Sequence, residues 1–186
     1  MEKVAKACVF ETNWGYFGLA GTDSHIWVTE LPGRDADEVK VHLHDRFERA
    51  RRAKGRYSSA GEIVWDSSYL AGLQGRVRAY FEGERVEFDL EVPVDIGEGG
   101  SFKNAVFKAC RGIGYGQTVS YGDLADLAGR KNASRAVGRL MAGNRMPLLV
   151  PCHRVLRKDG GLGGFSGPGG VAMKRRLLEH EERYGR

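Results

Sequence analysis

A glycine-rich stretch near the middle of the chain most constrains how the chain can fold. Residues 92–100, Val-Pro-Val-Asp-Ile-Gly-Glu-Gly-Gly, suit neither a helix nor a strand and predict a linker. Charge changes across it, because residues 1–95 carry 13 Lys and Arg against 17 Asp and Glu, a net charge of −4. Residues 96–186 carry 16 against 7, a net charge of +9. We therefore expect two domains, residues 1–95 and residues 96–186.

Length and composition suit a protein with a hydrophobic core. The 186 residues are 41% hydrophobic, and no apolar run approaches the roughly 18 residues that cross a bilayer. The cysteines are an odd number without close spacing, which argues against a disulfide framework: Cys8, Cys110 and Cys152. The first residues lack the apolar segment of a secretory signal. We expect a cytoplasmic protein, or a nuclear one in a eukaryote, with no membrane partner.

The first region has the pattern of a small α/β domain. Runs rich in β-branched and aromatic residues predict three short strands, at 8–12, 15–21 and 25–31. A following amphipathic helix up to Lys54 is predicted by apolar residues at four-residue spacing, Val39, Leu43 and Phe47. A second helix is expected over 67–81, and apolar alternation from Val86 to Leu90 predicts a further strand.

Histidines in the first helix of this region raise the question of a metal site. His42 and His44 could be combined with Cys8 or His25. Positions two apart on a helix face different directions, however, so exposed histidines are the simpler interpretation. We expect no metal and no cofactor.

The basic second region reads as mostly helical. Ser101 is a plausible N-cap for a helix through Cys110, and Ser120 one for a short helix that ends at Gly129. A further helix is expected from Ala133 to Ala142, after a tight turn. Two short helices joined in this way predict a helix-turn-helix, and the net positive charge makes nucleic acid the first candidate partner.

The second of these helices has a thin face of small residues that could approach nucleic acid closely, Ala133, Ser134, Ala136 and Gly138. Arg135 projects from its first turn. Arg139, Arg145 and Lys131 are placed to meet phosphates. A solvated charged face is the plainer alternative for any single run of this kind.

The segment Met146–Val155 carries the strongest signal of chemistry. Leu148–Val150 is an apolar run typical of a buried strand or extended segment, and Pro151 restrains the residue that follows it. A lone buried cysteine is usually just a small hydrophobic side chain. Cys152, however, is followed by His153 and Arg154, which supply a base and a fixed positive charge, so it is a candidate nucleophile.

Five separated motifs of the second region resemble the O6-alkylguanine-DNA alkyltransferases, in order and in approximate spacing. They are Ser120-Tyr121-Gly122-Asp123-Leu124-Ala125, Ser134-Arg135-Ala136-Val137-Gly138, Gly143-Asn144, Pro151-Cys152-His153-Arg154-Val155 and Leu177-Leu178-Glu179-His180-Glu181. The resemblance implies a ribonuclease-H-like α/β domain followed by a mostly α domain with a helix-turn-helix. It also implies single-turnover transfer of an alkyl group from O6-alkylguanine in DNA, and from O4-alkylthymine, to a protein cysteine.

The resemblance assigns a role to each catalytic candidate. Cys152 would take the alkyl group as a stable thioether, His153 would be its base through a bridging water, and Glu181 would orient the histidine. Tyr121 would give a proton or hydrogen bond to the departing guanine. Asn144 would brace the turn behind the cysteine.

Substrate and DNA contacts are implied in the same way. Pro147 and Val155 would line the alkyl pocket, and the base-binding loop would be Gly160–Gly170, with Gly163, Phe165 and Ser166. The helix from Ala133 would lie in the minor groove of double-stranded DNA, with Arg135 filling the space left by a flipped nucleotide. The protein would act as a monomer with little dependence on DNA sequence.

Two other classes of function fit part of the sequence. A binding module is one, either a helix-turn-helix regulator or an alkyltransferase-like protein that recognises a lesion without chemistry. The latter lacks the reactive cysteine, whereas Cys152 is present here. A cysteine hydrolase is the other, favoured by the Cys-His pair and weakened because no oxyanion-hole arrangement is evident near it.

Overall fold

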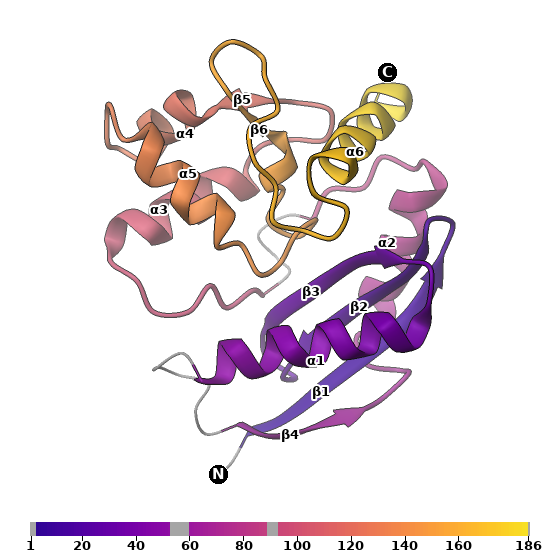
Figure 1. Ribbon diagram of the computed structural model, residues 1–186. Helices are drawn as coiled ribbons and strands as arrows, with labels where there is room; N and C mark the ends of the chain where they lie inside the picture. Colours follow the sequence, from indigo (N-terminus) through magenta and orange to yellow (C-terminus); the bar gives the residue numbers. More distant parts are fainter. Residues whose placement is uncertain (1–2, 53–59, 89–92, 186) are drawn as a thin grey trace. The chain divides into compact units, whose positions relative to one another are not determined.

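Two compact units make up the structure, a computed structural model that describes residues 3–52, 60–88 and 93–185 (Figure 1). One unit falls within Met1–Val86 and Pro93–Glu98, and the other within Glu87–Val92 and Gly99–Arg186. None of the helices in these described ranges is long and apolar enough to cross a membrane.

A four-stranded mixed sheet forms the centre of the N-terminal unit. Its strands are β1 (Lys3–Thr12), β2 (Gly15–Gly21), β3 (Ile26–Gly33) and β4 (Ala60–Trp65). The order is β3-β2-β1-β4, in which β1 to β3 form an antiparallel meander and β4 runs parallel to β1. The three strands expected from the sequence are confirmed, and β1 starts five residues earlier than predicted.

Helices cover both faces of this sheet (Figure 1). Alternate residues of β1 point to opposite sides, so Ala5 and Ala7 join the core beneath α1 (Ala36–Arg52), where Trp27 stacks on Phe47 at a ring-centroid distance of 5.4 Å. Cys8 points the other way, and Gln74 of α2 (Ala71–Glu82) donates to its sulfur. The mixed α/β character expected for this region is therefore confirmed.

Two details of the N-terminal unit differ from prediction. α2 begins at Ala71 instead of residue 67, because Leu70 adopts a left-handed conformation with φ 54° that separates a turn from the helix. The predicted strand from Val86 is not formed over Val86–Phe88, and its remaining residues lie outside the described ones. The fourth strand is β4, which the sequence analysis did not predict.

The expected linker also takes part in the N-terminal unit. Val94 forms a parallel bridge with Ile26, in which Ile26 donates to the Pro93 carbonyl and Asp95 donates to the Ile26 carbonyl. Through Val94, this stretch therefore pairs with β3, the edge strand of the sheet.

The C-terminal unit is mostly helical. Its elements are α3 (Ser101–Arg111), β5 (Val119–Ser120), α4 (Tyr121–Leu127), α5 (Ser134–Ala142), the 3₁₀ turn η1 (Cys152–Arg154), β6 (Val155–Leu156) and α6 (Gly170–Tyr184). β5 and β6 pair in parallel, with Val119 opposite Val155. This pairing brings the start of α4 close to the cysteine turn.

The predicted helix-turn-helix corresponds to α4 and α5, which pack against each other (Figure 1). Ser120 caps α4 as expected: its hydroxyl accepts from the Asp123 amide at 3.0 Å, and the Asp123 carboxylate accepts from the Ser120 amide at 3.1 Å. Ser101, by contrast, is the first residue of α3 and Gly100 is the N-cap, so that prediction was one residue late.

The segment before the cysteine is not the predicted strand. Residues 146–150 form a series of turns in which Leu148 has a positive φ of 77°, and the Val150 amide donates to the Met146 carbonyl. The side chains of Leu148, Leu149 and Val150 are nevertheless fully buried. An apolar run of this length predicts that its side chains are buried, but it does not distinguish a turn from a strand.

Candidate active site

Cys152 is held at the start of η1 by hydrogen bonds from both its own amide and a neighbouring side chain. Its amide donates to the Val150 carbonyl at 2.8 Å, and its Sγ accepts from Nδ2 of Asn144 at 3.1 Å. Asn144 also donates to the Val150 carbonyl at 2.9 Å and accepts from the Met146 amide at 3.0 Å. Asn144 thus fixes the turn and contacts the sulfur directly. The direct contact was not foreseen.

His153 and Glu181 form a buried pair directly behind the cysteine turn. Nε2 of His153 lies 2.8 Å from Oε1 of Glu181, and both side chains are fully buried. Nδ1 of His153 has no hydrogen-bond partner among the described residues. When Nε2–H donates to the carboxylate, Nδ1 keeps its lone pair and is free to act as a base.

Arg154 completes the environment of Glu181. Its Nε donates to Oε2 at 2.9 Å and its Nη2 to Oε1 at 3.0 Å, a two-point grip that leaves the guanidinium buried. The Gly116 amide donates to the same carboxylate at 3.1 Å. The sequence had suggested Arg154 as a positive charge beside the thiol, whereas the structure directs it to the carboxylate.

These contacts set the protonation states of the pair. Burial alone would raise the pKa of Glu181, but hydrogen bonds and charges from His153 and Arg154 outweigh it and hold that pKa well below its usual range. Burial lowers the pKa of His153, partly offset by Glu181. At neutral pH the site therefore holds a carboxylate and a neutral imidazole.

The local geometry of the Cys-His pair differs from that expected of an extended segment. In a strand, Cys152 and His153 would point to opposite faces. In the 3₁₀ turn η1, successive side chains are rotated by about 120°, so the two can face a common space more readily.

Lys174 is a buried cation near the thiol that the sequence analysis missed. Its side chain is fully buried in α6, and Nζ donates to the Val155 carbonyl at 2.6 Å and lies 5.8 Å from the centre of the Tyr121 ring. Burial lowers its pKa, whereas the charges of the Cys152 and Cys110 thiolates would raise it. The spacing of Lys174, Leu177 and Glu181 on one helical face was a signal that could have identified it.

A cavity of about 440 Å³ opens beside the cysteine. Its lining residues are Tyr121, Gly138, Met141, Ala142, Cys152, Gly164, Phe165 and Ser166. Five of these were site candidates, and Met141, Ala142 and Gly164 were not. Burial raises the pKa of Tyr121, which keeps its phenol protonated and able to donate a hydrogen bond.

Three other candidates for substrate contact are not among the residues that line this cavity. Pro147 and Val155 are buried, and neither is among the lining residues. Gly163 has φ +66°, and a Cβ built there would come within 2.9 Å of the Tyr121 hydroxyl. Its role in the structure is to leave room for Tyr121.

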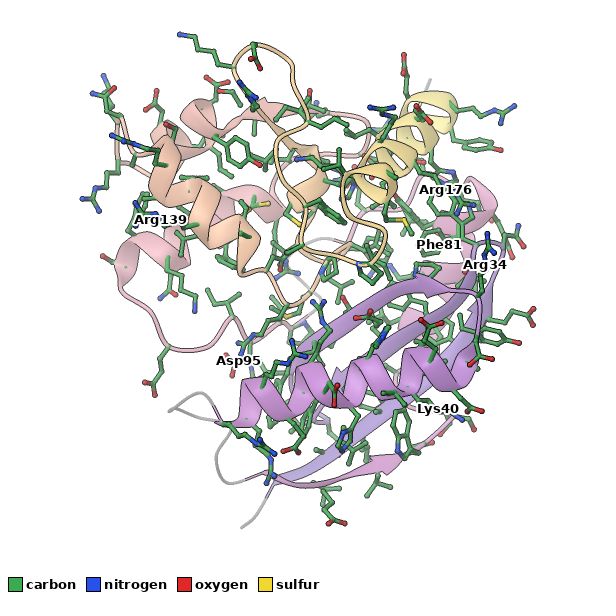
Figure 2. All side chains as sticks on the ribbon, viewed as in Figure 1. Arg34, Lys40, Phe81, Asp95, Arg139 and Arg176 are labelled. Carbon is green, nitrogen blue, oxygen red and sulfur yellow. The ribbon has the colours of Figure 1, made fainter. Side chains whose placement is uncertain are left out.

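The residues expected to contact DNA lie on α5. Ser134, Arg135 and Arg139 are exposed, whereas Ala133, Ala136 and Gly138 are half-buried. Arg139 is labelled where it projects from α5 (Figure 2). The opposite face of α5 is buried through Val137 and Met141, so one helix has both an exposed basic face and a part in the cavity wall.

A metal centre has no support in the part of the chain that the structure describes. No group of three or more His, Cys, Asp and Glu side chains there is arranged to hold a metal ion. His42 lies 3.8 Å from Glu30, and all three cysteines are free and buried.

The fold and the site define a class of protein: a helix-turn-helix protein with a buried, histidine-assisted cysteine beside a cavity. Comparison with known proteins makes the family explicit. A family model described as the DNA-binding domain of 6-O-methylguanine DNA methyltransferase matches residues 101–183. Relatives named methylated-DNA–protein-cysteine methyltransferase include one from Mycolicibacterium paratuberculosis, 35% identical over 163 residues, which are 87% of this chain and 90% of that protein.

Another relative of that name, from Mycobacterium tuberculosis, is 42% identical over 117 residues, which are 63% of this chain and 68% of that protein. Among solved structures, Mycobacterium tuberculosis OGT in complex with DNA is 32% identical, with a TM-score of 0.72 over 96% of this chain and 94% of that one. The chain belongs to the methylated-DNA–protein-cysteine methyltransferase family.

Proposed function

We propose that Cys152 is the residue that accepts the alkyl group in this chain. As a member of its family, the protein is a methylated-DNA–protein-cysteine methyltransferase that repairs O6-alkylguanine directly. The assignment to Cys152 rests on its position in the cavity wall. The adjacent residue, His153, has a free Nδ1 that can act as a base.

The reaction is a displacement of guanine from the alkyl carbon by the Cys152 sulfur. The Cys152 thiol gives its proton to Nδ1 of His153, through a solvent molecule, while Glu181 stabilises the imidazolium that forms. Sγ then bonds to the alkyl carbon as the bond from carbon to O6 breaks, and the electron pair of that bond remains with guanine. Tyr121 donates a hydrogen bond or proton to the departing base. The thioether lacks a hydrolysable carbonyl, so each molecule acts once.

The cavity supports a flipped base as the substrate. O6 of guanine is buried in a duplex, so the nucleotide must leave the stack at a cost of a few kcal/mol. Ser166 and Phe165 line the cavity, and in the proposal the Ser166 hydroxyl bonds O6 while the Phe165 ring stacks on the base. Gly163 contributes by accommodating Tyr121, and the proposed place of Pro147 and Val155 beside the alkyl group is supported only by their burial.

DNA binding is assigned to α5. Its small residues Ala133, Ser134, Ala136 and Gly138 would let the helix approach the minor groove, with Arg135 inserted in place of the flipped nucleotide and Arg139 near phosphate. The proposal includes a monomer in the cytoplasm, supported by the three free thiols. It also includes a ribonuclease-H-like N-terminal unit, supported by an antiparallel meander with a fourth strand parallel to the first.

Mass spectrometry of the intact protein tests the assignment. After incubation with O6-benzylguanine, we expect one benzyl adduct, located on Cys152 by peptide mapping, with one equivalent of guanine released. Cys152→Ser should remain unmodified, although Cys8 and Cys110 are still present. Modification of another cysteine, or continued release of guanine beyond one equivalent, would contradict the proposal. The second outcome would favour a hydrolase, and no reaction at all would favour a binding module.

A further inference from the structure

Glu87, which precedes α3 by fourteen positions, reaches the surroundings of the catalytic pair. Its Oε1 accepts a hydrogen bond from the Tyr115 amide at 2.8 Å, and its Oε2 lies 3.8 Å from Nη1 of Arg154. The Glu87 side chain is 44% exposed, whereas that of Arg154 is 4% exposed. One buried guanidinium therefore lies between two carboxylates, one at the surface and one in the interior.

The loop that leads to α4 is held by the same two carboxylates. Tyr115 donates its amide to Glu87, and the next residue, Gly116, donates its amide to Glu181. The Arg154 guanidinium lies 5.7 Å from the centre of the Tyr115 ring, and Nη1, the nitrogen nearest Glu87, donates to the Ile113 carbonyl. Residues 113–116 and the two carboxylates thus form a single hydrogen-bonded frame around Arg154.

We infer that Glu87 is a positioning residue of the alkyl-transfer reaction, which acts through Arg154 on the His153–Glu181 pair. The inference rests on the proposed role of His153 as the base. Glu87 lies 3.8 Å from Nη1, the end of the guanidinium that Glu181 does not hold, and its negative charge partly compensates that of Arg154. Without this compensation, Arg154 opposes the formation of imidazolium on His153, which must occur when the thiol gives up its proton.

Several other charged or titratable groups face the same pair and are unchanged by a substitution at position 87. Arg154 on η1 and Lys174 on α6 act on His153, and Cys110 on α3 and Tyr121 on α4 interact with Cys152. Unlike the buried Glu181, Glu87 has a side chain that is 44% exposed. Its contribution should be moderate and screened by solvent.

The test is the pH dependence of Cys152 alkylation in the full chain. Glu87→Gln keeps an oxygen that can accept from the Tyr115 amide and removes only the charge. We expect the second-order rate with O6-benzylguanine to fall about two- to fivefold near pH 7, the size typical of one partly exposed ion pair. At alkaline pH, where the rate depends less on proton transfer to His153, the variant and the wild type should converge.

Glu84→Gln is the matched control, because Glu84 is an exposed carboxylate three residues away. It should follow the wild-type profile. In a Glu181→Gln background, Glu87→Gln should have little further effect, since the route from Glu87 to the histidine is interrupted.

A different result would overturn the inference. A loss in Glu87→Gln that is equal at all pH values would show a purely structural role, and so would a fall in thermal stability without a change of profile. An unchanged rate near pH 7 would show no role. If Cys152 of the wild type is not alkylated at all, the proposed acceptor residue fails instead, and the two failures are distinguished by the wild-type mass.

Discussion

Gly163 lies against the ring that we assign to protonation of the leaving base. Its φ of +66° is a conformation that residues with a Cβ rarely adopt, and a Cβ there would lie 2.9 Å from the Tyr121 hydroxyl and 3.1 Å from a ring carbon. The position therefore matters both for the backbone of the loop and for the place of one side chain. These two effects can be separated by experiment.

Gly163→Ala should lower the alkylation rate about tenfold, because Tyr121 must move to admit the methyl group and loses its alignment with the base. Gly160→Ala is the matched control: its φ is +80°, but a Cβ there meets no atom within 4 Å. Both variants should lose about 1 kcal/mol of stability from the left-handed alanine. Stopped-flow alkylation with O6-benzylguanine measures the difference, and equal rates in the two variants would show that the ring does not need this glycine.

At the scale of the element, α5 has to pack against the protein on one face and, in the proposed function, approach DNA with the other. Val137 and Met141 bury one face, while Arg135 and Arg139 are exposed on the other. Gly138 is in the middle of the helix, where glycine costs about 1 kcal/mol relative to alanine. A Cβ at this position meets nothing within 4 Å, so protein packing does not require the glycine. We expect that the proposed close approach of α5 to DNA requires it instead.

Gly138→Ala should accordingly stabilise the C-terminal unit by about 0.5–1 kcal/mol and slow repair of O6-methylguanine in duplex DNA. Reaction with free O6-benzylguanine should change less, because the free base needs no approach of the helix to DNA. Gly75→Ala in α2 is the control, since its Cβ also meets no atom within 4 Å and α2 belongs to the N-terminal unit. Equal effects on the two substrates would remove the proposed contact of α5 with DNA.

At the scale of the whole molecule, charge is divided between the two halves of the chain. The net charge is −4 for residues 1–95 and +9 for residues 96–186. Around the turn between α4 and α5, four basic side chains are exposed: Arg130, Lys131, Arg135 and Arg139. Binding that depends on such groups releases counterions from DNA and is therefore weakened by salt.

We expect the logarithm of DNA affinity to fall with the logarithm of salt concentration with a slope of about −3 to −4, for about four phosphate contacts. Arg139→Gln should reduce this slope by about 1, and Lys40→Gln on the N-terminal helix α1 should leave it unchanged. Fluorescence anisotropy on several unrelated duplexes measures both slope and sequence preference. A strong preference for one sequence would instead indicate a regulator.

Local patterns in the sequence predicted most of the elements and the candidate nucleophile. Runs of β-branched and aromatic residues define β1 to β3, four-residue spacing defines α1, and the Ser120 cap defines α4, because each depends on neighbours close in the chain. The pairing of Cys152 with His153 is local for the same reason. In the apolar run 148–150, the sequence pattern predicted burial but did not determine whether the segment is a strand or a series of turns.

Only the tertiary structure decided which groups surround the cysteine turn. Glu181 was expected from the family resemblance, but the two-point grip of Arg154 upon it, the buried Lys174 and the contact of Glu87 with the Tyr115 amide were not. β4 was missed because its parallel pairing with β1 joins residues more than fifty positions apart. Contacts at such separations depend on how elements pack, which neither spacing nor propensity encodes. The sequence by itself indicated Cys152 as the candidate nucleophile, and packing determined which charges surround it.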